Sequence, residues 1–338
     1  MGVGAVSLPL AAVGTAPASA GGPAYGANGP SRIDVHHHAS PAFYKDWLVS
    51  RGQTAGGLKI PDWSVPMAKE IMDLHGVRTS ILSISTPGVH LGDDTEARTM
   101  ARRVNEHVAE IVKDEPARFG LFATLTLPDV AGALEELAYA FDTLHADGVI
   151  LLANSRGVYL GDPAFDPLME ELNRRHAVVF VHPSSLPANP IAGVPPYIAD
   201  FLLDTTRAAV NLVRKGTTTR YPNIRYILAH GGGFLPYASH RIAFTFGLDG
   251  SAWTPEAVLN ELGKFYYDTA QTSAQAAFPT LLEFAGEDRV LFGSDFPHVT
   301  APGVAYFTKQ LDESRLPAKT QRAINRQNAL ALFPRLAN

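Results

Sequence analysis

Histidines and one aspartate follow apolar stretches of the chain, and these residue types bind divalent metals. His36 and His38 end the first stretch, where alternate residues of a strand share a face, so they predict a chelating pair with His37 pointing away. His182 ends a second run in Phe-Val-His-Pro, and Asp295 follows a third in Leu-Phe-Gly-Ser-Asp-Phe-Pro. A buried imidazole needs a polar partner and a buried carboxylate needs a cation. The sequence therefore predicts a metal site built from these three histidines and Asp295.

The available ligands limit the type of metal. The sequence contains no cysteine, so thiolate ligands and disulfides are excluded. Three imidazoles and one carboxylate suit Zn²⁺, with Mn²⁺, Fe²⁺ or Co²⁺ as alternatives, and leave a position open for water or substrate. We expect one divalent metal, with zinc preferred, and no organic cofactor.

His230 ends another apolar run, in Ile-Leu-Ala-His-Gly-Gly-Gly, and has two possible roles. One role is that of a fifth metal ligand. The other is that of an acid/base, in which the neutral imidazole takes a proton from water at the metal. We expect the acid/base role. The glycines at 231–233 allow positive φ and close approach to a ligand, although a plain turn explains them equally well. His298 is expected at the pocket rim, and the remaining histidines are interpreted as surface or packing residues.

The elements that position these residues alternate regularly along the chain. Short apolar runs are separated by stretches with helical spacing, such as the stripe formed by Leu134, Leu137, Phe141 and Leu144. The predicted strands cover residues 32–36, 79–83, 121–125, 148–152, 178–182, 225–229, 265–268 and 289–292. Eight such α/β units predict a (β/α)8 TIM barrel of the metal-dependent hydrolase type, whose chemistry lies at the carboxyl ends of the strands. An open doubly wound sheet is the alternative, but no Gly-x-Gly-x-x-Gly follows the first strand.

Composition bounds the remaining possibilities. The 338 residues are 46% hydrophobic and 18% charged, which suits one globular domain over residues 31–338. The net charge of −5 comes without a basic run, so nucleic acid and membrane are not expected partners. Residues 1–30 carry no charge and contain Ala18-Ser19-Ala20, which predicts a signal-peptide-like or a disordered segment. A signal peptide truncated at its basic end would imply export, and a disordered tail would imply a cytoplasmic protein.

Four motifs together resemble the amidohydrolase superfamily. They are Ile-Asp-Val-His-His-His at 33–38, Phe-Val-His-Pro at 180–183, Leu-Ala-His-Gly-Gly-Gly at 228–233 and Gly-Ser-Asp-Phe-Pro at 293–297. The likeness runs from Arg32 to the C-terminus and is nearest to the aminocarboxymuconate-semialdehyde decarboxylase group, with 161–175 similar to its 6-methylsalicylate decarboxylase members. The resemblance implies the ligands and the acid/base named above. No lysine lies in 148–154, where dinuclear barrel hydrolases carry their bridging lysine, which favours one metal.

The resemblance also implies a reaction and a partner. The reaction is non-oxidative decarboxylation of an aromatic or enoic carboxylic acid, with the proton supplied by water and His230 or by Asp295. Arg241 matches a position that pairs with substrate in a neighbouring subunit, which implies a homodimer; a surface arginine is the alternative. Arg51 is a second candidate for the substrate carboxylate, and Phe296, with Phe43 and Trp63, is expected to orient a flat acid. Hydrolysis of a lactone, ester or amide at the same site is the alternative reaction, and a non-catalytic metal-binding protein is a third possibility.

Overall fold

Eight parallel strands form a barrel in the computed structural model, which describes residue 29 and residues 31–337. The strands are β1 (Arg32–His38), β2 (Val77–Ser83), β3 (Phe119–Thr124), β4 (Gly148–Leu152), β7 (Val178–His182), β8 (Arg225–Leu228), β9 (Tyr266–Asp268) and β10 (Val290–Leu291). They pair in this order. Backbone hydrogen bonds from Val35 to Phe292 (3.0 Å) and from His38 to Phe296 (2.7 Å) close the ring between β1 and the segment around β10. The predicted (β/α)8 barrel is confirmed.

Two apolar layers hold the barrel together. Alternate residues of the strands, including Ile81, Phe122 and Phe180, fill the interior, and the other set packs against the surrounding helices. A register shift in β1 between Asp34 and His37 adds one residue relative to β2. Bulges of this kind redirect side chains and are frequent near active sites.

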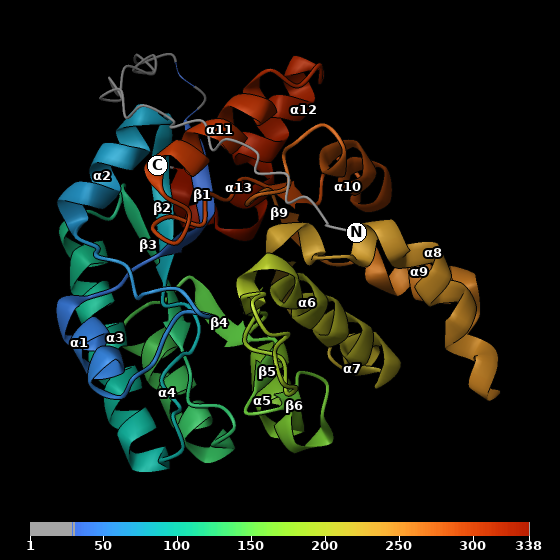
Figure 1. The fold of residues 1–338 in the computed structure, drawn as a ribbon, viewed down its shortest axis with the longest axis horizontal. Helices are drawn as coiled ribbons and strands as arrows, with labels where there is room; N and C mark the ends of the chain where they lie inside the picture. The colour runs from blue at the N-terminus through green and yellow to red at the C-terminus, as the bar shows by residue number, and fades with distance from the viewer. Residues whose placement is uncertain (1–28, 30, 338) are drawn as a thin grey trace, which may run out of the picture.

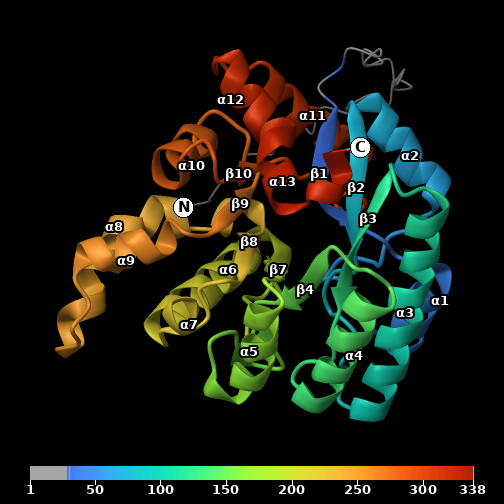
Figure 2. The same ribbon diagram turned by 180° about the vertical axis from the view of Figure 1, so that it is seen from behind.

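The helices surround the strands, with α2, α3 and α4 on one side and α8, α9 and α10 on the other (Figures 1 and 2). The helices of eight or more residues are α1 (Ala42–Ser50), α2 (Val65–Leu74), α3 (Asp94–Asp114), α4 (Val130–Asp142), α5 (Asp166–Arg174), α6 (Pro196–Arg214), α8 (Leu235–Phe246), α9 (Pro255–Leu262), α10 (Ala277–Ala285) and α11 (Ala301–Asp312). Asp129 caps α4 by accepting the N–H of Gly132, as expected for aspartate before a helix. Within the described residues, no helix combines the length and apolar character needed to span a bilayer.

The C-terminal segment closes the end of the barrel opposite the predicted site. It consists of α12 (Ala318–Arg322), a π-helical turn (Ala323–Gln327) and α13 (Asn328–Leu332). Behind α13, Phe333 packs its ring 5.7 Å from that of Phe122 in the barrel interior. Arg32 is fully buried beneath this segment, where it donates to Asn325 at 2.9 Å and pairs with Asp312.

Two long connections lie at the other end of the barrel, one after β1 and one after β7. The first contains α1, and the second leads from β7 into α6. Between β4 and β7 the chain forms an unpredicted hairpin of β5 (Asn154–Ser155) and β6 (Val158–Tyr159). The predicted signal-peptide-like or disordered segment, residues 1–30, lies outside the described residues except for residue 29, so that expectation stays a prediction.

Candidate metal centre

His36, His38, His182, His230 and Asp295 come together at the carboxyl end of the barrel. The ring of His36 lies 4.9 Å from that of His38, 5.3 Å from His182 and 4.9 Å from His230, measured between centroids. Four of these residues, His36, His182, His230 and Asp295, each place a ligand atom within 4.8 Å of the others. His38 adjoins them, with Nε2 3.0 Å from His36 Nε2 and 3.3 Å from Asp295 Oδ1. The described residues thus contain a divalent-metal site in which His230 lies as close as the other histidines.

The three predicted histidine ligands are oriented from behind by hydrogen bonds at Nδ1. The pairs are His36 with Asp268 Oδ2 (2.7 Å), His38 with Ser83 Oγ (3.0 Å) and His182 with the carbonyl of Pro183 (2.9 Å). A proton held at Nδ1 leaves the lone pair of Nε2 free to bind a cation. The Nε2 atoms of these rings are therefore available to a cation.

Charge balance at the centre also fits a cation. Burial lowers the pKa of His36, but the carboxylates of Asp268 and Asp295 outweigh burial and raise that pKa to about 10. Burial raises the pKa of Asp295, but the neighbouring imidazoles, with His36 the strongest, hold it well below its usual range. Asp295 Oδ1 is buried without a hydrogen-bond partner. A divalent cation would give this buried oxygen a partner and would compensate the negative charge of Asp295.

Asp268 and Gln271 belong to the site although the sequence analysis gave them no role. Asp268 is fully buried at the end of β9 and accepts the backbone N–H of His230 at 2.9 Å as well as Nδ1–H of His36. Gln271 donates from Nε2 to Asp295 Oδ2 at 2.9 Å. The position of Asp268 at a strand's carboxyl end is the same signal that identified the other site residues, whereas Gln271 lies in a loop with no such signal.

Asp34 fixes the loop that carries Asp295. Its carboxylate accepts from the hydroxyl of Ser294 at 2.5 Å, the backbone N–H of Ser294 at 3.1 Å and the backbone N–H of His36 at 3.0 Å. The aspartate is 1% exposed, so each of these bonds lies in a low-dielectric interior. Asp34 thereby holds the first strand and the Asp295 loop together on either side of the site.

His230 sits on a strained turn that the glycines make possible. It has φ 53°, and its Nε2 lies 3.3 Å from Asp295 Oδ2. Its Nδ1 is buried without a hydrogen-bond partner. Gly233 has φ 67°, and a Cβ there would lie 2.1 Å from the carbonyl oxygen of Leu202, so only glycine fits this close approach. A left-handed non-glycine residue is costly and is typical of functional sites.

A cavity of about 640 Å³ opens above the metal centre. His182, His230 and Asp295 line its base, and His298, expected at the pocket rim, also lines the cavity. The other walls are largely apolar and include Leu58, Tyr197, Phe201, Leu202, Phe234, Val299 and Phe307. A largely apolar pocket with a few polar groups at one place is typical of a site that binds a small molecule.

Several predicted substrate-binding residues lie elsewhere. Phe296 does not line the cavity; it is 6% exposed and packs with Ile71 and Val304 behind the barrel wall. Arg51 pairs with Glu96. Phe43 stacks under Arg103, and Trp63 packs against the core, so neither lines the cavity. Arg241 is exposed on α8 and does not reach the cavity of its own chain.

The fold and the site define a (β/α)8-barrel protein with a divalent-metal site of histidine and aspartate side chains at the strand ends. Residues 33–335 match the family described as Amidohydrolase. The chain belongs to this family.

Similar proteins include named decarboxylases. The chain is 38% identical over 319 residues to the 6-methylsalicylic acid decarboxylase of Penicillium expansum, covering 90% of this chain and 97% of that protein. A crystal structure described as an amidohydrolase superposes with a TM-score of 0.84 at 29% identity and covers 90% of this chain and all of that one. The 5-carboxyvanillate decarboxylase of Novosphingobium aromaticivorans, solved with manganese, shares the fold with a TM-score of 0.78 at 22% identity, covering 90% and 96% of the two chains.

Proposed function

We propose that this protein is a metal-dependent decarboxylase that removes carbon dioxide from an aromatic carboxylic acid without an oxidant. The observation that carries the proposal is the cavity whose base holds the histidine and aspartate cluster and whose walls are apolar. The 38% identity with a 6-methylsalicylic acid decarboxylase over nearly its whole length supports the same reaction. Substituted salicylates are therefore the first substrates to test.

The proposed metal site consists of His36, His38, His182 and Asp295. A bound divalent cation supplies the positive charge that neutralises the substrate carboxylate and an adjacent oxygen. Both Zn²⁺ and Mn²⁺ bind imidazole and carboxylate ligands, so the types of ligand are compatible with either metal. We propose one metal per chain.

The apolar walls position the substrate ring. Phe201, Phe234 and Phe307 line the cavity together with aliphatic side chains. Aromatic neighbours prefer stacked or edge-to-face contacts with a flat ligand and exclude water from it. This arrangement holds the ring against the base of the cavity with its carboxylate directed at the metal ligands.

His230 is the proposed proton donor. It lines the cavity, and its backbone is fixed by Asp268. In the proposed reaction His230 delivers a proton to the ring carbon that bears the carboxylate, and that carbon becomes tetrahedral. The bond to the carboxylate then breaks, carbon dioxide leaves, and the electron pair of that bond restores the aromatic ring. Solvent returns the proton to His230, so one proton is consumed for each carbon dioxide released.

A homodimer formed through α8 is the second part of the proposal. Tyr237 and Phe244 are 88% and 71% exposed, and helical spacing places them on the same face of α8 as Arg241; Leu248, 73% exposed, lies in the turn that follows. Exposed apolar patches of this kind mark protein interfaces. Phe234, which directly precedes α8, also lines the cavity. The proposed interface on α8 therefore begins beside the cavity. Arg241 then points toward the second subunit.

The experiment that tests the proposal combines metal analysis with carbon dioxide release from a panel of salicylates, hydroxybenzoates and muconate-type acids. About one metal per chain with release from a panel member would support the proposal. One metal with no release, but with cleavage of esters or lactones, would replace it with hydrolysis. Protein without metal after reconstitution would remove the proposed site.

A further inference from the structure

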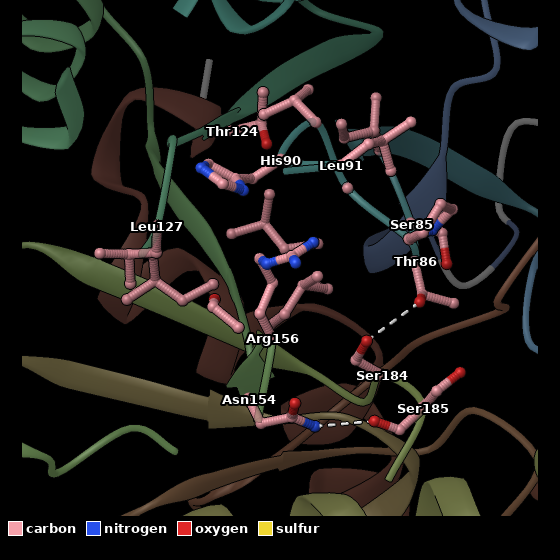
Figure 3. A pocket seen from close by; sticks show the side chains of 18 of the residues that line it. Ser85, Thr86, His90, Leu91, Thr124, Leu127, Asn154, Arg156, Ser184 and Ser185 are labelled. Atoms are coloured by element: carbon pink, nitrogen blue, oxygen red, sulfur yellow. Dashed lines mark hydrogen bonds between the residues drawn. The ribbon is translucent and has the colours of Figure 1, made fainter. Parts of the chain in front are cut away.

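A second cavity, of about 500 Å³, lies beside the metal-centre cavity and has a different character. Ser85 and Thr86 line both cavities, so the two share a wall. Figure 3 shows the second cavity, where a hydrogen bond of 3.3 Å joins the hydroxyls of Thr86 and Ser184. Its polar lining includes His90, Asn154, Arg156, Ser184 and Ser185.

Arg156 brings an unpaired positive charge to this cavity. It occupies the turn of the β5–β6 hairpin, and its guanidinium is directed into the cavity (Figure 3). Among the described residues, no hydrogen bond or ion pair engages it. Its Nη1 would lie 3.4 Å from a Cβ on Gly92, which places the guanidinium between the hairpin and the segment that carries His90. A guanidinium with five free donors in a concave surface is suited to binding a carboxylate.

The hairpin that carries Arg156 is held firmly in place. Asp204, fully buried on α6, accepts from Asn154 Nδ2 at 2.9 Å, from the hydroxyl of Tyr159 at 2.7 Å and from the backbone N–H of Ser184 at 2.8 Å. These bonds tie both strands of the hairpin and the loop after β7 to one helix. The position of the Arg156 backbone is thus determined by the fold.

His90 lines the same cavity beside Arg156. Its Nε2 lies 2.8 Å from Asp94 Oδ1, whereas its Nδ1 is buried without a hydrogen-bond partner. In Figure 3 the guanidinium of Arg156 lies near the centre, and the ring of His90 lies above it.

We propose that Arg156, with His90, forms a subsite for a second carboxylate of the substrate. This proposal rests on the proposed function and narrows it to an aromatic dicarboxylic acid. One carboxylate lies at the metal ligands, and the other reaches past the wall formed by Ser85 and Thr86 to the guanidinium.

The test compares binding of isophthalate, a dicarboxylate, with binding of benzoate, its monocarboxylate counterpart, to metal-loaded protein by calorimetry. A hydrogen-bonded ion pair with Arg156 should make isophthalate bind about tenfold tighter than benzoate. Arg156→Met should abolish most of that difference while benzoate binding changes less than about twofold, and Arg156→Lys, which keeps the charge, should restore part of it. The control is Arg207→Met, which removes an exposed arginine of α6 that does not line this cavity.

Two outcomes would overturn the subsite: isophthalate binding no tighter than benzoate in the unmodified protein, or equal losses from Arg156→Met and Arg207→Met. Calorimetry needs no turnover, so the subsite is judged separately from decarboxylation. An Arg156-dependent preference for isophthalate without carbon dioxide release from any acid would uphold the subsite and remove the proposed reaction.

Discussion

Asp268 Oδ2 lies 2.7 Å from Nδ1 of His36, and both side chains are completely buried. The other oxygen of the same carboxylate accepts the backbone N–H of His230 at 2.9 Å. One aspartate therefore orients a proposed metal ligand and the proposed proton donor together.

Replacing Asp268 by Asn should weaken metal binding about 10- to 100-fold, as is usual when the group behind a ligating histidine is altered. Metal affinity is measured by competition with a chelator. Asp288→Asn, on an exposed turn, is the matched control. Unchanged affinity in Asp268→Asn would show that His36 does not depend on this contact.

Replacing His230 by Gln should lower kcat about 10²- to 10⁴-fold, which is the usual contribution of a positioned acid or base. Metal content should stay near that of the unmodified protein, because the four proposed ligands remain. Both quantities are measured on the same preparation. Loss of the metal together with activity would identify His230 as a ligand.

Replacing Ser294 by Ala should destabilise the protein by about 1–3 kcal/mol, because Asp34 Oδ2 loses the donor at 2.5 Å and remains buried. Urea unfolding measures the change. Ser314→Ala serves as a control, since Ser314 donates only to the carbonyl of Leu311 at the end of α11. Equal effects of the two substitutions would contradict a special role for the Asp34 contact.

Stability should depend on Glu171 at low pH. Its hydrogen bonds from Arg174 outweigh its burial and, with Arg175, lower its pKa to about 2, against about 4.3 in an unfolded chain. A folded-state pKa below the unfolded value gives stability that is present above about pH 4.3 and is lost as the pH falls toward 2. The stability difference between the unmodified protein and Glu171→Gln should therefore shrink over this range in urea unfolding. A difference independent of pH would refute the assignment.

Replacing Tyr237 by Glu should dissociate the proposed dimer, because a charge would enter the centre of its apolar contact. Analytical ultracentrifugation measures the association state. Tyr306→Glu, at a tyrosine that is 54% exposed on α11, should leave the dimer intact. If the unmodified protein is a monomer, the proposed dimer interface is wrong.

The residues that sequence patterns predict well are those whose role follows from a single strand. The spacing of His36 and His38 and the apolar runs before His182 and His230 were sufficient to predict that these histidines lie at the same end of the barrel. Roles that depend on partners far along the chain were missed: Asp268 acts through His36, 232 positions away, and Asp34 acts through Ser294, 260 positions away. Such contacts exist only once the barrel has closed.

The remaining differences have local causes. Phe296 follows Asp295 directly, and it points into the packing behind the barrel wall while Asp295 faces the metal centre. The two-residue strands β5 and β6 are too short to produce a recognisable alternation of apolar residues. The hairpin with Arg156 was consequently not predicted.

The closure of the barrel by its own C-terminus has a consequence for synthesis on the ribosome. Arg32 in the first strand bonds to Asn325, 293 positions later, and Phe333 fills the floor of the interior. Asp295 also lies in the last part of the chain to emerge. Contacts so distant in sequence form late and slow the search for the native state. The barrel therefore cannot close until residues 323–337 have been made, and the proposed ligand Asp295 joins the histidines of the earlier strands only at that late stage of folding.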